Sequence, residues 1–160
     1  MTDDHDLRDL EPAERVERLL EAVSDALGLG ASVEVEQDSE AIRATLHGDD
    51  LGLFIGRHGT TIDAVQHLAY KLVAVDKHPA PRVVVDAAGY RARREQALHR
   101  QADQAAENVL RGGRPVALDA MSATERKVVH EYLKERSGVE TYSEGTEPDR
   151  HLVVAPLVSE

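Results

Sequence analysis

The sequence contains no cysteine and no tryptophan, and only 3% of its 160 residues are aromatic. Without cysteine the chain can form neither a disulfide framework nor a thiolate metal site. Four tyrosines and one phenylalanine are too few for a platform on which several bases stack. Apolar runs span only a few residues, and the first twenty residues carry charges throughout. We therefore expect no membrane span, no secretory signal and a soluble protein in the cytoplasm.

Acidic residues outnumber basic ones, but the excess is confined to one end of the chain. The formal net charge is −11, from 19 basic and 30 acidic residues. The first 50 residues hold 4 basic and 15 acidic residues, which accounts for the whole excess. A negative total argues against a nucleic-acid binder, whose surface is usually basic. The near-neutral remainder of the chain still allows a local basic face.

The first half of the chain begins with a helix and a hairpin. Residues 1–10 are acidic and aperiodic, which is typical of a disordered lead. A helix begins at Pro12, has apolar residues at three- and four-residue steps, and ends at Gly28. The segments 31–37 and 42–46 alternate between apolar and polar residues and are separated by a short link. This pattern predicts two strands of a β-hairpin.

Two short helices and a buried strand follow the hairpin. Residues 51–55 predict one helical turn, with an aspartate just before it as the cap. A second helix begins at Thr60, with Asp63 three residues later as a capping partner. The valine-rich segment 82–86 predicts a buried strand. The expected order for this half is α-β-β-α-α-β.

The second half predicts the order α-β-α-β-β. Residues 89–111 form a helical stretch of about 35 Å at ~1.5 Å per residue, and Gly112 with Gly113 ends it. Its predicted apolar stripe consists of Leu98, Ala102, Ala105 and Val109. The remaining expected elements are a strand at 115–118, a helix from a capping box at Ser122 and Glu125 to about residue 136, and strands at 139–143 and 151–155.

A Gly-x-x-Gly segment lies between the two short helices, at Gly56, Arg57, His58 and Gly59. Such a segment alone is more often an ordinary connection between helices than a binding site. Here, however, two glycines allow a sugar-phosphate backbone to approach closely. The helix that follows directs amides and its positive dipole end toward the same place. Arg57 and His58 add side-chain donors, and together these features are the physical design of a KH clamp on single-stranded RNA.

The chain resembles the Jag family, also called SpoIIIJ-associated or KhpB proteins, over roughly residues 12–156. The first half is similar to a bacterial-type KH domain, through residues 54–59 and the following 61–66. The second half is similar to a small domain named for an Arg-x-x-x-His motif, which stands here at residues 126–130. The pair of motifs makes the resemblance specific. Many members carry a further N-terminal Jag domain that this sequence does not match.

The resemblance implies an α+β protein, a type II KH domain plus a small α/β Arg-xxx-His domain joined by a long helix. We expect the lead at residues 1–10, the KH domain at 11–88 and the Arg-xxx-His domain at 89–160. The implied function is binding of single-stranded RNA, with single-stranded DNA as an alternative, and post-transcriptional regulation linked to bacterial cell elongation and division. A small single-KH protein is the implied partner, and the membrane insertase is a genomic neighbour.

The helix around the Arg-x-x-x-His motif carries a basic edge. At 100° per residue, Val128, Val129, Tyr132 and Leu133 face the core. The expected basic edge consists of Arg126, Lys127, His130 and Lys134. Four donors on one edge can hold one or two phosphates. The alternative is a solvated face with pairs such as Glu131 to Lys134, and the resemblance favours phosphate contact.

Further candidate RNA-binding residues lie beside these two motifs. Ile55, Ile62 and Val65 are candidates for an apolar groove next to the glycine loop. Arginines also crowd the start of the long helix and could extend a phosphate track, with Arg93 and Arg100 as the candidates. A solvated helix start, partly neutralised by Glu95 and Asp103, explains that cluster equally well.

Metal and catalytic sites are not expected, and neither is a cofactor. The eight histidines are scattered, with no pair at i and i+4. His130 and Glu131 open like a zinc-protease motif, but Lys134 stands where the second histidine belongs. There is no Walker A loop, dinucleotide fingerprint or nucleophile elbow. The main rival to RNA binding is therefore a protein-interaction adaptor near the insertase, whose acidic N-terminal third suits a basic partner.

Overall fold

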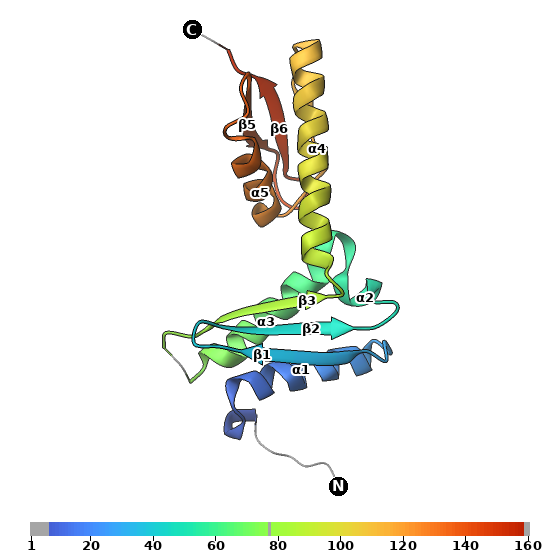
Figure 1. The fold of residues 1–160 in the computed structure, drawn as a ribbon, viewed down its shortest axis with the longest axis vertical. Helices are drawn as coiled ribbons and strands as arrows, with labels where there is room; N and C mark the ends of the chain where they lie inside the picture. The colour runs from blue at the N-terminus through green and yellow to red at the C-terminus, as the bar shows by residue number, and fades with distance from the viewer. Residues whose placement is uncertain (1–6, 77, 159–160) are drawn as a thin grey trace. The chain divides into compact units, whose positions relative to one another are not determined.

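The computed structural model describes residues 7–76 and 78–158 of the chain. They belong to two compact units, unit 1 (Met1–Arg91) and unit 2 (Ala92–Glu160). Both units combine helices with a three-stranded sheet (Figure 1), so the α+β class is confirmed. Residues 1–6 of the expected lead at residues 1–10 lie outside the described residues. From there, Leu7–Asp9 forms a short 3-10 helix instead of an irregular segment.

Unit 1 has the expected order α-β-β-α-α-β. Its elements are α1 (Pro12–Ala26), β1 (Ser32–Gln37), β2 (Ala41–His47), α2 (Gly52–Ile55), the 3-10 helix η2 (Arg57–Gly59), α3 (Thr60–Ala74) and β3 (Arg82–Ala87). The sheet order is β1-β2-β3, with β2 antiparallel to β1 and parallel to β3. The helices α1 and α3 cover one face of this sheet, as Figure 1 shows.

The core of unit 1 lies between its sheet and its two long helices. The stripe predicted on α1 contributes Val16 and Leu20, and the alternation predicted on β2 contributes Ile42 and Leu46. Phe54, the only phenylalanine of the chain, is fully buried in the same cluster. The short helix α2 is thereby anchored to the core through a single aromatic side chain.

Unit 2 packs two helices against an antiparallel sheet. Its elements are α4 (Tyr90–Gly112), which starts in unit 1, followed by β4 (Val116–Ala117), α5 (Ala123–Leu133), β5 (Val139–Glu144) and β6 (His151–Pro156). The sheet order is β4-β6-β5. The stripe predicted on α4 is confirmed, since Leu98, Ala102, Ala105 and Val109 are all buried. α5 ends at Leu133, three residues before the predicted end, where the Arg136 amide donates to the Leu133 carbonyl.

Of the two capping boxes predicted from the sequence, the structure confirms one and contradicts the other. The capping box at Ser122 is confirmed, because the Glu125 amide donates to Ser122 Oγ at 3.2 Å and the Ser122 amide donates to the Glu125 carboxylate at 3.3 Å. The box predicted for α3 is wrong. The N-cap of α3 is Gly59, which has no cap from a side chain, and Asp63 pairs with Arg91 at 2.9 Å instead. The predicted aspartate before α2 is Asp50, which accepts from the Gly52 amide.

Candidate nucleic-acid interface

The loop at residues 56–59 requires glycine at both of its ends. Gly56 has φ 73° and ψ 174°, and Gly59 has φ 79°, which L side chains rarely adopt. A Cβ atom on Gly56 would lie 2.3 Å from Thr61 Oγ1 and 2.8 Å from the Thr61 amide nitrogen. A Cβ atom on Gly59 would lie 3.0 Å from the ring of Tyr90. The bare backbone therefore packs against its own unit and leaves the loop surface open.

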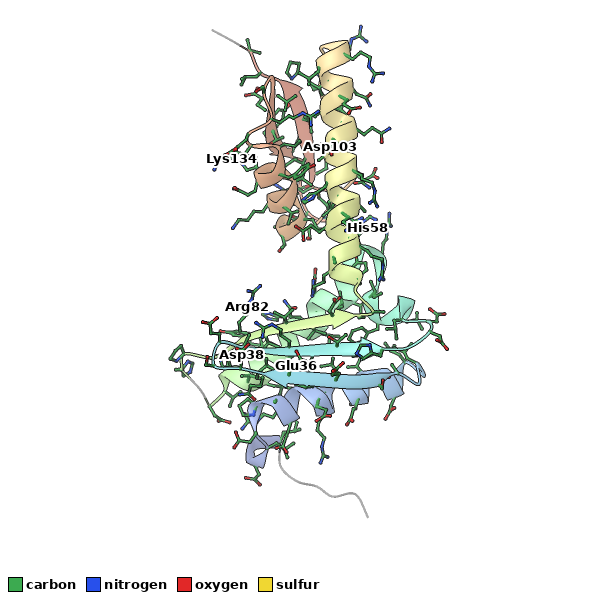
Figure 2. The ribbon with its side chains drawn as sticks, in the orientation of Figure 1. Glu36, Asp38, His58, Arg82, Asp103 and Lys134 are labelled. Atoms are coloured by element: carbon green, nitrogen blue, oxygen red, sulfur yellow. The ribbon has the colours of Figure 1, made fainter. Side chains whose placement is uncertain are left out.

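The two residues inside this loop expose polar side chains. Arg57 and His58 are both exposed, and neither has an ion-pair partner within residues 7–76 and 78–158. Figure 2 shows His58 on the outside of the loop. His58 adopts the left-handed conformation, with φ 53° and ψ 27°, which costs a residue other than glycine on the order of 1 kcal/mol. Such strained residues concentrate at functional sites.

The apolar residues beside the loop are placed differently from the expectation. Ile62 is 0% exposed and Val65 is buried too, so neither can line an accessible groove, because both fill the core beneath α3. Ile55 is half-buried. Leu53, which sequence reasoning missed, is 66% exposed on α2. The signal for Leu53 was its neighbour Phe54, since a helical turn that buries one side chain directs the adjacent one outward.

The first turn of α4 is hydrogen-bonded to α3 and β3 through Arg91. Arg91 Nε donates to the Val85 carbonyl at 2.7 Å, and its guanidinium reaches Asp63 at 2.9 Å and Gln66 at 3.0 Å. Gln66 also accepts from the Val85 amide at 2.9 Å. Arg91 therefore joins α3 to the outer edge of β3. Arg91 belongs to the arginine cluster at the start of the long helix, but its guanidinium is hydrogen-bonded within unit 1.

Among the other arginines near the start of α4, one forms a largely buried ion pair and two are exposed. Arg94 donates to the Glu125 carboxylate at 2.6 Å, and both side chains are largely buried. This ion pair holds α4 and α5 together inside unit 2. Arg93 and Arg100 are exposed. Neither of these two residues lines a pocket with the Arg-x-x-x-His motif, so the predicted track between the motifs stays a prediction.

A basic pocket of about 380 Å³ opens between α5 and the β5–β6 hairpin. Arg126, Lys127 and His130 of the predicted basic edge line it together. Its other lining residues are Ala123, Thr141, Tyr142, Ser143, Arg150 and Leu152. The hairpin thus supplies hydroxyl groups and a further arginine that no helix pattern could reveal. Lys134 is not part of the pocket.

Arg126 lies in the wall of this basic pocket rather than on an exposed edge. It is only 8% exposed, and its guanidinium donates to the Met121 carbonyl at 2.7 Å and to Glu147 at 2.7 Å. Arg126 of the predicted basic edge is therefore a wall residue with partners of its own, and its contact with a phosphate stays a prediction. The segment before α5 and the β5–β6 turn close over this residue. Its guanidinium fixes both segments, and the Glu147 carboxylate competes for its charge.

Lys127, His130 and Lys134 differ in the contacts that their side chains make. Lys127 is exposed and, among the residues that the structure describes, has no ion-pair partner. His130 Nδ1 forms a hydrogen bond with Thr141 Oγ1, which orients the ring on the pocket rim. Lys134 lies 3.8 Å from Glu131, the pair that the solvated alternative predicted. Lys127 and His130 are therefore the accessible donors that the predicted edge contributes to the basic pocket. Arg150, from outside that edge, is a third.

No metal site accompanies these groups in the described part of the chain. Within residues 7–76 and 78–158, no three His, Asp or Glu side chains gather to hold an ion. None of the helices in the same residues has both the length and the apolar character needed to cross a membrane.

Comparison with known proteins assigns both halves of the chain. Residues 13–86 match the family model described as KhpA/KhpB, KH domain, and residues 96–156 match the model of the R-three-H domain, the Arg-x-x-x-His domain. Three relatives are each named RNA-binding protein KhpB. The Clostridium symbiosum relative is 35% identical over 85% of this chain, the Lactiplantibacillus plantarum relative 41% over 79%, and the Bacillus subtilis relative 29% over 91%. The chain spans 62%, 40% and 71% of their respective lengths.

Proposed function

The chain belongs to the KhpB family, with a KH domain followed by an Arg-x-x-x-His domain, and we propose that it binds single-stranded RNA through both domains. The relatives named above are RNA-binding proteins by name. The observation that carries the proposal is the open loop at residues 56–59. Its backbone is held in a conformation that only glycine adopts readily. Its two inner side chains, Arg57 and His58, are exposed and have no ion-pair partner among the residues that the structure describes.

At the loop, the chain would clamp the sugar-phosphate backbone rather than read bases. At Gly56 and Gly59 the missing Cβ atoms make room for Thr61 and Tyr90 of the chain itself, so the glycines set the shape of the loop and its exposed residues Arg57 and His58 face the phosphate. Arg57 supplies planar charged donors for the phosphate oxygens. No side chain caps α3 at Gly59, so the first amides of α3 and its dipole are directed at the same oxygens.

At the basic pocket, the accessible donors are Lys127, His130 and Arg150. The positive charges of Lys127 and Arg150 favour a phosphate, and the hydroxyl group of Ser143 can donate to its remaining oxygens. Arg126 adds positive potential from the wall and holds the pocket in shape. Phosphate contacts of this kind position a strand without specifying its sequence.

The finer function follows from the resemblance stated above. We propose a post-transcriptional regulator linked to bacterial cell elongation and division, acting in the cytoplasm with a small single-KH protein as partner. Single-stranded DNA is the competing strand, because contacts to phosphate groups do not distinguish RNA from DNA, whereas a contact to the 2′-hydroxyl group does.

The test is fluorescence anisotropy with a short single-stranded RNA at two salt concentrations. We compare wild type with the double variants Arg57→Asp/His58→Asp and Lys127→Ala/His130→Ala, and use Arg111→Asp, an exposed arginine outside both sites, as the control for charge. Affinity that falls steeply with salt, and that each double variant weakens but the control does not, supports the proposal. Equal affinity in all four proteins contradicts it.

The adaptor alternative is favoured by the acidic surface of unit 1. Glu21 and Asp25 on α1 and Glu34 and Glu36 on β1 are all exposed and carry its charge, and further exposed acidic residues of the same unit add to it. Such a surface repels phosphate and suits a basic protein. Absence of RNA binding by the wild type at both salt concentrations would favour this alternative.

A further inference from the structure

A second pocket of unit 2, of about 350 Å³, lies between α4 and α5 on the other side of Lys127 from the basic pocket. Lys127 lines both pockets. The second pocket differs in its chemistry, because its lining is mostly apolar surface from Val128, His99 and Tyr132. Its volume is in the range of small-molecule sites. A strand bound at the basic pocket can therefore continue past Lys127 into a surface suited to a flat, weakly polar group.

Tyr132 is held in place before any ligand arrives. Its ring stacks on His99 with centroids 3.9 Å apart and planes at 9°. Its hydroxyl donates to Asp103 at 3.0 Å, and Arg136 fixes that carboxylate at 3.3 Å; Figure 2 labels Asp103 on α4. The residue nevertheless remains 41% exposed. A fixed aromatic ring with open surface loses little entropy when a second flat group packs against it.

The charged groups of this second pocket select against phosphate. Glu95 and Glu131 both line it beside Lys127. Glu95 lies 3.9 Å from His99 and Glu131 lies 3.8 Å from Lys134, which is beyond hydrogen-bond distance, so both carboxylates can still repel a phosphate and accept hydrogen bonds from N–H groups. A nucleobase combines a flat face for stacking with an edge that carries such donors. Guanine presents two adjacent N–H donors that match one carboxylate, whereas uracil presents one N–H between two carbonyl oxygens.

We propose that this pocket is a base subsite, in which Tyr132 stacks one nucleobase of a strand whose phosphate lies at the basic pocket, with guanine preferred over uracil. Lys127 stands between the two positions and neutralises the phosphate that joins them. The inference rests on the proposed RNA binding of unit 2 and adds to it a source of base preference. It gives this unit a role that phosphate contacts alone do not supply.

The test measures the affinity of the full chain for short oligonucleotides that differ only in one guanine or uracil. Wild type is compared with Tyr132→Ala, with Tyr132→Phe, which keeps the ring, and with Tyr70→Ala, a control for removing an equally exposed tyrosine in unit 1. We expect Tyr132→Ala to bind the guanine strand about tenfold more weakly, the loss typical of one stacked base. Its guanine preference should disappear, while Tyr132→Phe and Tyr70→Ala keep it.

The outcomes separate this inference from the proposed function. Salt-dependent binding by wild type with no base preference, and no effect of Tyr132→Ala, overturns the base subsite and leaves RNA binding intact. No binding by wild type overturns both. If Tyr132→Ala fails to fold, wild type is titrated with guanosine monophosphate and with uridine monophosphate. NMR signals of the Tyr132 and His99 rings then test the base subsite. Larger ring shifts with guanosine support the subsite, and shifts confined to residues of the basic pocket contradict it.

Discussion

Asp38 holds the turn between β1 and β2 with one carboxylate. Its Oδ1 accepts from the Glu40 and Ala41 amides at 2.8 Å each, and its Oδ2 accepts from the Arg43 guanidinium. The hydrogen bond from Arg43, followed by those from the two amides, lowers the pKa of Asp38 from 3.8 to about 2. All three interactions stabilise the ionised carboxylate of the folded state.

The pKa of Asp38 therefore predicts a pH dependence. Because the folded-state pKa is the lower one, the contribution to stability is present above about pH 4 and is lost as the pH falls toward about 2. We expect Asp38→Asn to be less stable than wild type at neutral pH, and this difference to shrink across that window. Urea unfolding at several pH values measures it. Asp25→Asn, at an exposed position on α1, is the control for removing one carboxylate, and equal behaviour of the two variants would contradict the assignment.

The pair of Arg126 and Glu147 offers a second test on single side chains. Glu147 is exposed and pairs with the Arg126 guanidinium at 2.7 Å, so in the proposed RNA complex its carboxylate would compete with a phosphate for that charge. Glu147→Gln should therefore raise RNA affinity up to about fivefold, the factor that corresponds to the ~1 kcal/mol of an exposed ion pair. Glu140→Gln removes the same charge from an exposed position of β5 outside the basic pocket. Anisotropy titrations that show equal gains for both variants would assign the effect to net charge alone.

At the scale of elements, the conformation of the loop between α2 and α3 depends on close packing around its glycines, which the glycine content of the sequence does not reveal. Gly28 and Gly56 both have positive φ, at 66° and 73°. A Cβ atom on Gly28 would meet nothing within 4 Å, whereas one on Gly56 would collide with Thr61. Glycine is thus required at position 28 by backbone conformation alone. At position 56 it is required by both backbone conformation and close packing.

This contrast predicts different costs for the same substitution. Gly28→Ala should lower the free energy of unfolding of unit 1 by about 1 kcal/mol, the cost of a left-handed alanine. Gly56→Ala should lower it by about 3 kcal/mol, because the loop must also move away from Thr61. Denaturant titrations followed by NMR signals of β2 measure both values. Equal losses would show that the loop relaxes freely around the added methyl group.

At the scale of the whole molecule, two separate sites on one chain can act on one strand. Linking two weak sites raises the overall affinity through effective concentration, without any new contact. This suits a protein whose accessible donors are few at each site and whose net charge is −11. The loop at residues 56–59 and the basic pocket are the two sites in question.

Strand length is therefore expected to matter more than sequence for affinity. A strand long enough to reach both sites should bind wild type about a hundredfold more tightly than a strand that fills one site. Arg57→Asp/His58→Asp or Lys127→Ala/His130→Ala should each remove that gain. Titrations with two strand lengths test this, and a variant that keeps the gain would show that its site does not share the strand.

The sequence by itself determined the order of elements in both units, the buried stripes of α1 and α4, and the cap at Ser122. These features depend on residues a few positions apart, so local periodicity and hydrogen-bonding rules are sufficient to find them. The glycines of the loop were visible for the same reason. The pairing of two short motifs was enough to indicate the family.

Only the tertiary structure decided which side chains remain available. The helical period places Arg126 and Lys127 on one edge, but the turn that carries Glu147 closes over Arg126 alone. It likewise places Tyr132 toward the core, whereas His99 and Asp103 hold that ring at an exposed position. Burial depends on what a distant segment brings against a helix, and a local pattern carries no information about that contact.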